Sequence, residues 1–178
     1  MPKPIDLRRE RLAHIVKVTM RALHRALQMR LAQHSVSVGH WTYLRALWQT
    51  DGLTQRELSE EAGLAEPTTF TALKAMERRG YVVRRPAEGD RRKRQVFLTP
   101  SGRALEAKLV PLAEDVNAVA VRGLPAADVA KTRRTLLALL DNLNDDESRP
   151  GNDTRRVPST RELGRLVERA TRSDQALK

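Results

Sequence analysis

A short run of basic side chains carries the strongest chemical signal in the sequence. Residues 88–99 read EGDRRKRQVFLT, in which Asp90 precedes four consecutive cations, Arg91, Arg92, Lys93 and Arg94. Clustered Lys and Arg side chains neutralise phosphates, so the run is typical of a nucleic-acid contact, with a solvated loop tip as the alternative. Asp90 subtracts from this charge, and it is therefore either incidental or a brace that orders its neighbours.

The positive charge is gathered in blocks. The formal net charge is +11, and residues 77–103 carry nine Lys and Arg against three acids, while residues 1–34 carry eight against two. Blocks of one sign form patches on a folded surface, and such patches attract nucleic acid or anionic membranes. Solubility alone is the alternative explanation, and nucleic acid is the partner that the blocks favour.

Composition and motifs exclude several classes of function. The chain has no cysteine, which rules out disulfides, thiolate metal sites and thiol-based redox sensing. Its four histidines are scattered, so we expect no metal site. We find no Gly-rich phosphate loop, nucleophile elbow or paired carboxylates, and expect no catalytic residue, no cofactor and no enzyme activity. No apolar run approaches the ~20 residues of a membrane span and no secretory leader is visible, which favours a cytoplasmic protein without a membrane partner.

The elements that must position the basic run are mainly helical. Apolar side chains three and four residues apart predict one long helix over residues 7–33 and a second over residues 40–49. Two shorter helices follow, separated by Gly63. The first of them begins with a potential capping box, in which Thr54 and Glu57 each accept a hydrogen bond from the other's backbone.

The fourth helix and the segment after it give the clearest fold signature. Pro67 suits the first turn of this helix, and Gly80 ends it. Its expected apolar face consists of Phe70, Ala72, Leu73 and Met76. β-prone runs over residues 81–85 and 94–99 then predict a hairpin with a charged tip. Two short helices joined by a tight turn and followed by a hairpin make a winged helix-turn-helix.

Further helices and a polar tail complete the expected chain. A helix capped by Thr99 follows the wing, and Pro111 inside it predicts a kink. The last core helix spans residues 126–143. Residues 145–158 have the composition of a linker. A short helix over residues 159–170 has a capping box but a narrow apolar face, so order and disorder are left open there.

The fold class is therefore mainly α with a small β-wing, a winged helix-turn-helix flanked by dimerisation helices. We expect an N-terminal dimerisation helix (1–34), a DNA-binding domain (35–100), C-terminal dimerisation helices (101–144) and a polar basic tail (145–178). The outer helices present more apolar length than a monomer readily covers, which predicts a homodimer. A two-fold dimer sets two recognition helices on successive major grooves, ~34–36 Å apart, and so predicts a palindromic operator.

The order of elements and three motifs resemble the MarR family of bacterial transcription regulators over residues 10–143. The motifs are LTQRELSEEAGLAEPTT (53–69), ALKAMERRGYVVR (72–84) and DRRKRQVFLTPSGRAL (90–105). The last contains the family's wing signature, here Asp90, Arg92, Leu98 and Thr99. The resemblance implies that Arg92 enters a minor groove and that Asp90 holds the wing by pairing with a nearby arginine. GHWTYLRALWQTDGLTQRELS (39–59) is similar to members that control aromatic-acid catabolism.

Carried onto the fourth helix, the resemblance turns Thr68, Thr69 and Thr71 toward the major groove, where hydroxyls bond to base edges or phosphate. A capped, solvated helical turn is the alternative. Many relatives carry Arg or Lys where this chain has Thr71 and Ala75. Hydrogen bonding to guanine from these two positions is therefore lost, and sequence recognition depends more on the wing and on DNA shape. The full set of expected contacts to double-stranded DNA is Thr54, Gln55, Pro67, Thr68, Thr69, Thr71, Lys74, Arg84, Asp90, Arg91, Arg92, Lys93 and Arg94.

Family members commonly bind an anionic aromatic ligand between the dimerisation helices and the winged helix, and binding releases the DNA. The resemblance therefore implies a homodimeric repressor with a small-molecule effector, of which an aromatic carboxylate is the favoured class, since a cation beside aromatic rings suits a carboxylate. The candidate lining residues are His24, Arg30, His40, Trp41, Tyr43 and Trp48. Ordinary core tryptophans and hydrogen-bonded histidines are the alternative. A ligand-independent architectural DNA-binding protein, without sequence preference, is the functional alternative.

Overall fold

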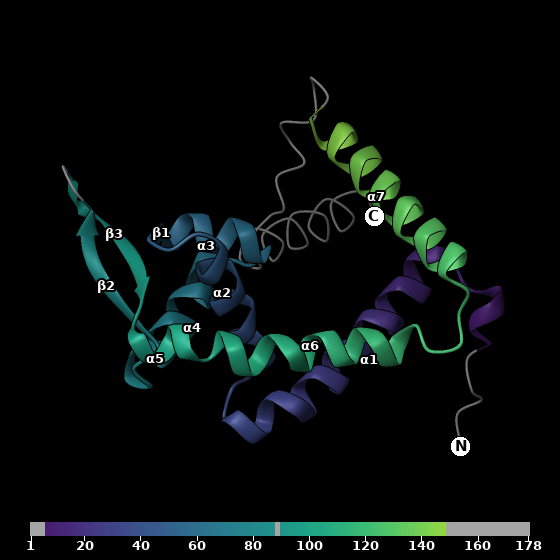
Figure 1. The fold of residues 1–178 in the computed structure, drawn as a ribbon. Helices are drawn as coiled ribbons and strands as arrows, with labels where there is room; N and C mark the ends of the chain where they lie inside the picture. Colours follow the sequence, from purple (N-terminus) through teal and green to yellow (C-terminus); the bar gives the residue numbers. More distant parts are fainter. Residues whose placement is uncertain (1–5, 88–89, 149–178) are drawn as a thin grey trace, which may run out of the picture. The chain divides into compact units, whose positions relative to one another are not determined.

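The computed structural model describes residues 6–87 and 90–148 (Figure 1). The side chains of residues 87 and 90–93 are not described. The chain divides into two compact units, Met1–Arg122 and Gly123–Lys178. The described elements are η1 (Leu7–Arg9), α1 (Leu12–Leu31), η2 (Ala32–His34), α2 (Val38–Gln49), β1 (Leu53–Thr54), α3 (Gln55–Ala62), α4 (Glu66–Arg78), β2 (Val82–Ala87), β3 (Asp90–Leu98), α5 (Pro100–Ala104), α6 (Glu106–Ala120) and α7 (Ala126–Glu147). The predicted fold class, mainly helical with a small antiparallel sheet, is confirmed.

One hydrophobic core holds the first unit together. It draws on α1, α2, α3, α4, α6 and the sheet, and its centre consists of Leu31, Leu44, Leu47, Leu58, Leu73, Met76, Val96 and Leu109. α6 lies along α1, so the end of the first unit packs against its beginning (Figure 1). The core therefore fixes the winged helix to the α1–α6 pair.

The long N-terminal helix begins later than the sequence predicts. Asp6 caps the 3-10 helix η1 by accepting from the Arg8 backbone at 3.2 Å, and the backbone is then extended at Glu10 and Arg11. The helix proper therefore starts at Leu12, and the prediction of a single helix over residues 7–33 is wrong in its first turns. The competing local cap at Asp6 explains the difference, because short polar side chains favour turns over helix interiors.

The helix-turn-helix follows the prediction closely. The Glu57 backbone donates to Thr54 Oγ1 at 3.2 Å, and the Thr54 backbone donates to Glu57 Oε2 at 2.7 Å, which completes the predicted capping box of α3. Gly63 ends α3 with a φ of 61°, a left-handed conformation that glycine adopts without steric cost. Pro67 lies in the first turn of α4, as predicted.

The wing is the hairpin β2–β3, and it belongs to a three-stranded antiparallel sheet with the order β1-β3-β2. Val82 pairs with Leu98 and Pro86 with Arg94, and the register shifts after Pro86. Strand β1 was not predicted; Leu53 pairs with Val96 across the sheet. β1 joins the start of α3 directly to the wing, so the wing is tied to the helix-turn-helix at its base.

The helix after the wing is interrupted before it reaches Pro111, where the sequence predicts a kink. Thr99 caps α5 by accepting from the Gly102 backbone at 3.1 Å, as predicted. The interruption falls at Leu105, between α5 and α6, while α6 continues through Pro111. Pro111 removes only the hydrogen bond to the Ala107 carbonyl, and both residues are exposed, so water can hydrate that carbonyl.

The second unit is described only over α7 and its flanks. α7 runs from Ala126 to Glu147, so residues 145–147, predicted as the start of a linker, are helical instead. The larger apolar side chains exposed on α7 are Leu136, Leu137, Leu140 and Leu143. The helix predicted as possible over residues 159–170 lies outside the described residues.

Candidate functional site

Helix α4 presents most of its predicted contact residues to solvent. Pro67, Thr68, Thr71 and Lys74 are all exposed. The Thr71 hydroxyl bonds within the helix, because its Oγ1 donates to the Pro67 carbonyl at 3.0 Å. What Thr71 presents outward is therefore mainly its methyl group.

Thr69 was predicted to face DNA, and that prediction is wrong. Its side chain is completely buried, and its Oγ1 accepts a hydrogen bond from the Tyr43 hydroxyl at 3.1 Å. A buried tyrosine hydroxyl requires a partner, and Thr69 is the group on α4 that supplies it. The threonine therefore joins α4 to α2 inside the core.

The structure places both Phe70 and Arg84 differently from the sequence prediction. Phe70, predicted to be in the apolar face of α4, is 45% exposed. Arg84, predicted to contact DNA, lies over the Phe70 ring at 5.3 Å and pairs with Glu77 at 2.5 Å. The hydrogen bond from Arg84 holds the pKa of the Glu77 carboxyl below its ordinary value, and Glu77 raises the pKa of Arg84 in turn. Arg84 is thus committed to an internal ion pair that ties β2 to α4.

A cleft of about 1010 Å³ lies between the start of α3, the start of α4 and the wing. The predicted contact residues Thr54, Gln55 and Arg94 all line it, together with Phe70 and Arg84. Arg56 also lines the cleft and was missed; it pairs with Glu60 at 2.9 Å, the neighbour one turn away. The side chains of Asp90, Arg91, Arg92 and Lys93 lie outside the described side chains, and only their place at the start of β3 is given.

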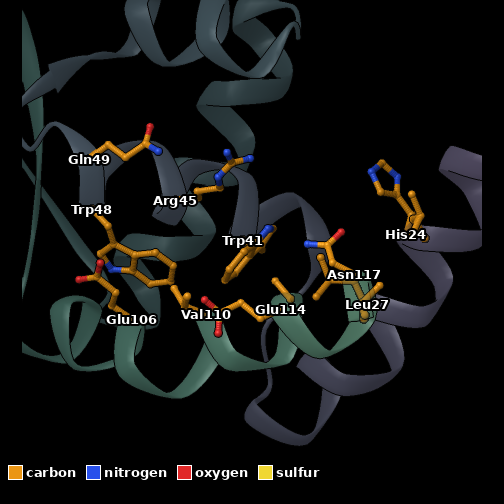
Figure 2. Close-up of a pocket in the computed structure, with 13 residues that line it drawn as sticks. His24, Leu27, Trp41, Arg45, Trp48, Gln49, Glu106, Val110, Glu114 and Asn117 are labelled. Atoms are coloured by element: carbon orange, nitrogen blue, oxygen red, sulfur yellow. The ribbon is translucent and has the colours of Figure 1, made fainter. Parts of the chain in front are cut away.

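A second hollow, of about 450 Å³, lies between α1, α2 and α6 (Figure 2). Three predicted ligand residues, His24, Trp41 and Trp48, line it. The two indoles meet edge to face, with centroids 5.5 Å apart and an interplanar angle of 70°. Trp48 is fixed further by its Nε1, which donates to the Gly102 carbonyl at 3.0 Å. The hollow therefore has a rigid aromatic wall.

The charged groups of this hollow were not the predicted ones. Arg45 lies one turn after Trp41 on α2, and Glu106 and Glu114 come from α6 (Figure 2). Within the described part of the chain, none of these three side chains forms an ion pair. Arg45 could have been found from its spacing, since residues four apart share one face of a helix.

The other three predicted ligand residues do not line this hollow. Arg30 is paired with Asp115 at 2.6 Å, an ion pair that links α1 to α6. Tyr43 is 1% exposed and points into the core toward Thr69. His40 lies beside Arg79 in a separate shallow hollow, where burial and then the charge of Arg79 lower its pKa, and its Nδ1 has no hydrogen-bond partner within the described residues.

Over residues 6–87 and 90–148, no group of three or more His, Asp or Glu side chains is placed to hold a metal ion. None of the described helices is both long enough and apolar enough to span a membrane.

Comparison with known proteins decides the family. Residues 36–93 match the sequence profile of the MarR family. The chain is 30% identical to the HTH-type transcriptional regulator TtmR of Methylorubrum extorquens (strain PA1) over 142 residues, which cover 80% of this chain and 67% of the relative. The chain belongs to the MarR family. The predicted resemblance is thereby confirmed, and the relatives are transcriptional regulators that bind DNA rather than enzymes.

Solved structures share the fold, among them a MarR transcriptional regulator from Methanosarcina mazei Go1, which is 22% identical, with a TM-score of 0.70 over 75% of this chain and 96% of its own. The transcriptional regulator PA3341 is 30% identical, with a TM-score of 0.69 over 76% of this chain and 99% of its own. CouR from Rhodococcus jostii RHA1, solved bound to p-coumaroyl-CoA, is 20% identical, with a TM-score of 0.64 over 73% of this chain and 91% of its own. The winged helix and its flanking helices are therefore the family architecture.

Proposed function

We propose that this MarR-family regulator is a homodimeric repressor that binds a palindromic operator and is released by a small aromatic carboxylate. The observation that carries the proposal is the hollow between α1, α2 and α6, which has an aromatic wall and charged groups that form no ion pair among the described residues. A ligand there touches both the winged helix and the helices that we assign to dimerisation. Its binding energy can therefore change the spacing of the two recognition helices.

Unpartnered apolar side chains support the homodimer. Leu12, Val16 and Met20, four residues apart on one face of α1, are 52%, 38% and 50% exposed. The leucines of α7 are similarly exposed. Full burial of an exposed apolar side chain stabilises by about 1.5–3 kcal/mol, and these half-buried side chains would gain roughly half of that each, so a second copy that covers them is favoured. Residues 1–34 and 101–144 would supply the dimer and residues 35–100 the DNA-binding domain.

The proposed DNA contacts follow from the surface of α4, the cleft and the wing. Helix α4 enters the major groove with its exposed N-terminal side chains, and the wing reaches the adjacent minor groove, as in other winged helices. Arg92 is the proposed minor-groove residue and Asp90 its brace. The remaining proposed contacts are Thr54, Gln55, Pro67, Thr68, Thr71, Lys74, Arg91, Lys93 and Arg94.

The charges of the hollow restrict how an aromatic carboxylate would bind. Its ring would lie against the Trp41–Trp48 pair, and its carboxylate would point to Arg45, away from Glu106 and Glu114. The ligand of the fold neighbour CouR, p-coumaroyl-CoA, supports an aromatic effector here as well. Repulsion by two carboxylates makes orientation, and not only charge, a condition for binding.

Fluorescence anisotropy with a labelled operator tests the proposal. Aromatic carboxylates should release the wild-type protein from DNA, and the matching uncharged amides should not. Arg45→Gln should lose this discrimination. Lys108→Gln, which removes an exposed cation of α6 outside the hollow, should keep it. Release of Arg45→Gln at wild-type concentrations would refute the proposed carboxylate contact, and a protein that no aromatic acid releases would refute the effector class.

A further inference from the structure

Phe70 is the exception among the large apolar side chains of α4. Leu73 and Met76 are completely buried, whereas Phe70 remains 45% exposed. The helix thus leaves its largest apolar side chain on the surface, where the ring forgoes the stabilisation that burial would give. Single exposed apolar residues are common on protein surfaces, so exposure alone assigns no function to Phe70. The position of Phe70 and its neighbours are the further evidence.

The exposed ring is held in one orientation. The Arg84 guanidinium lies over it at 5.3 Å from the centroid, and Glu77 fixes that guanidinium at 2.5 Å. Glu77 and Phe70 belong to α4, and Arg84 belongs to β2, so the three side chains bridge the recognition helix and the wing. A ring fixed in this way loses little rotamer freedom when it binds, which lowers the cost of a contact.

The ring is also placed where base edges are read. Phe70 lies three residues after Pro67 and four before Lys74, so it borders the exposed face of α4. It lines the cleft that Arg94 and the start of α3 also line. In helix-turn-helix proteins, the N-terminal residues of this helix approach the bases of the major groove.

An apolar readout is available on this face beside the hydroxyl of Thr68 and the carboxylate of Glu66. The exposed residues of the first two turns of α4, Glu66, Pro67, Thr68 and Thr71, include no Arg, Lys, Asn or Gln that could bond to a purine with two hydrogen bonds. The apolar group that base pairs present in the major groove is the C5 methyl of thymine. We infer that Phe70 is a specificity-determining residue that contacts a thymine methyl in each half-site.

The inference rests on the proposed placement of α4 in the major groove, and its test separates the two. Wild-type protein first selects an operator from randomised duplexes. Each thymidine is then replaced singly by deoxyuridine, which pairs identically but lacks the methyl group. Wild-type affinity should fall about fourfold at one position in each half-site, the effect of about one methylene-sized contact. Phe70→Ala should bind both duplexes equally, and Phe70→Leu should keep part of the difference.

Thr71→Ser is the matched control, because it removes the methyl group of a neighbouring exposed residue of α4 and keeps the hydroxyl that bonds to Pro67. Retention of the full deoxyuridine effect in Phe70→Ala would overturn the inference, whatever Thr71→Ser shows, as would a wild-type protein insensitive to every replacement. Operator selection that succeeds while either result holds leaves the proposed function intact. Failure to select any operator would refute the proposed function and the inference with it.

Discussion

The hydrogen bond between Tyr43 and Thr69 gives the sharpest test of which face of α4 meets DNA. Thr69→Val keeps the shape of the side chain and removes its oxygen. The Tyr43 hydroxyl, which donates to Thr69 Oγ1 at 3.1 Å, then has no partner in a site where Tyr43 is 1% exposed. An unsatisfied buried polar group of this kind costs about 1–3 kcal/mol.

The reverse substitution should cost less, and the asymmetry is part of the prediction. In Tyr43→Phe, Thr69 loses a donor but can still donate its own hydroxyl to the Ala65 carbonyl one turn earlier. We therefore expect Tyr43→Phe to cost about 0.5–1.5 kcal/mol, the net value of one hydrogen bond. In the double variant no buried hydroxyl is left unpaired, so its loss should be smaller than the sum of the single losses.

Urea denaturation at one fixed protein concentration measures these differences, because the stability of a dimer depends on concentration. Each kcal/mol should lower the melting temperature by roughly 2–4 °C in a protein of this size. The operator affinity of folded Thr69→Val, measured at 20 °C or below, should equal that of the wild type. We expect no change as large as about tenfold. Wild-type stability combined with lost operator affinity would refute the assignment of Thr69 to the core.

Three further predictions concern the close packing, the ion pair and the wing. Gly102→Ala should strongly destabilise the fold in thermal unfolding, because the added Cβ would lie 2.1 Å from the Tyr81 carbonyl oxygen. Gly39→Ala is the control: its Cβ would lie 3.8 Å from Ser37 Oγ, and the substitution should be neutral or stabilising by up to about 1 kcal/mol. Glu77→Gln should reduce the free energy of unfolding at neutral pH. The difference from the wild type, measured by urea denaturation, should close as pH falls through the lowered pKa of Glu77, because a depressed carboxyl pKa stabilises the fold only above that pKa. A difference that widens in acid would contradict the ion pair. Arg92→Ala should weaken operator binding and reduce its salt slope by about one unit, and Asp90→Ala should weaken binding if Asp90 is a brace but tighten it if only net charge matters.

Local signals in the sequence were sufficient for much of the fold. The Thr54–Glu57 capping box, the Gly63 turn and the Thr99 cap each depend on neighbouring residues, and all three are present. β1 escaped prediction because it is two residues long and exists only through its pairing with Val96, far along the chain. The start of α1 was misplaced because the cap at Asp6 competes with helical periodicity.

Side-chain roles on α4 and in the effector hollow were harder to predict, because they depend on partners distant in sequence. Periodicity assigned Phe70 to the core, and the family resemblance assigned Thr69 to the surface. In the structure the Tyr43 hydroxyl donates to Thr69 inside the core, and the Arg84 guanidinium lies over the ring of Phe70. Arg30 was expected to meet a ligand, yet Asp115 neutralises it from α6. Hydrophobicity scales and helical spacing contain no information about such pairings.

The central claim, sequence-specific binding of DNA by this MarR-family regulator, is tested most directly by one competition measurement. The full-length protein is bound to its selected palindromic operator at moderate salt and challenged with unlabelled operator or a scrambled duplex of equal composition. We expect the scrambled duplex to compete at least about 10³-fold more weakly, the lower range for specific DNA-binding proteins. Equal competition by both duplexes would contradict the claim and would identify an architectural protein that binds DNA through charge alone.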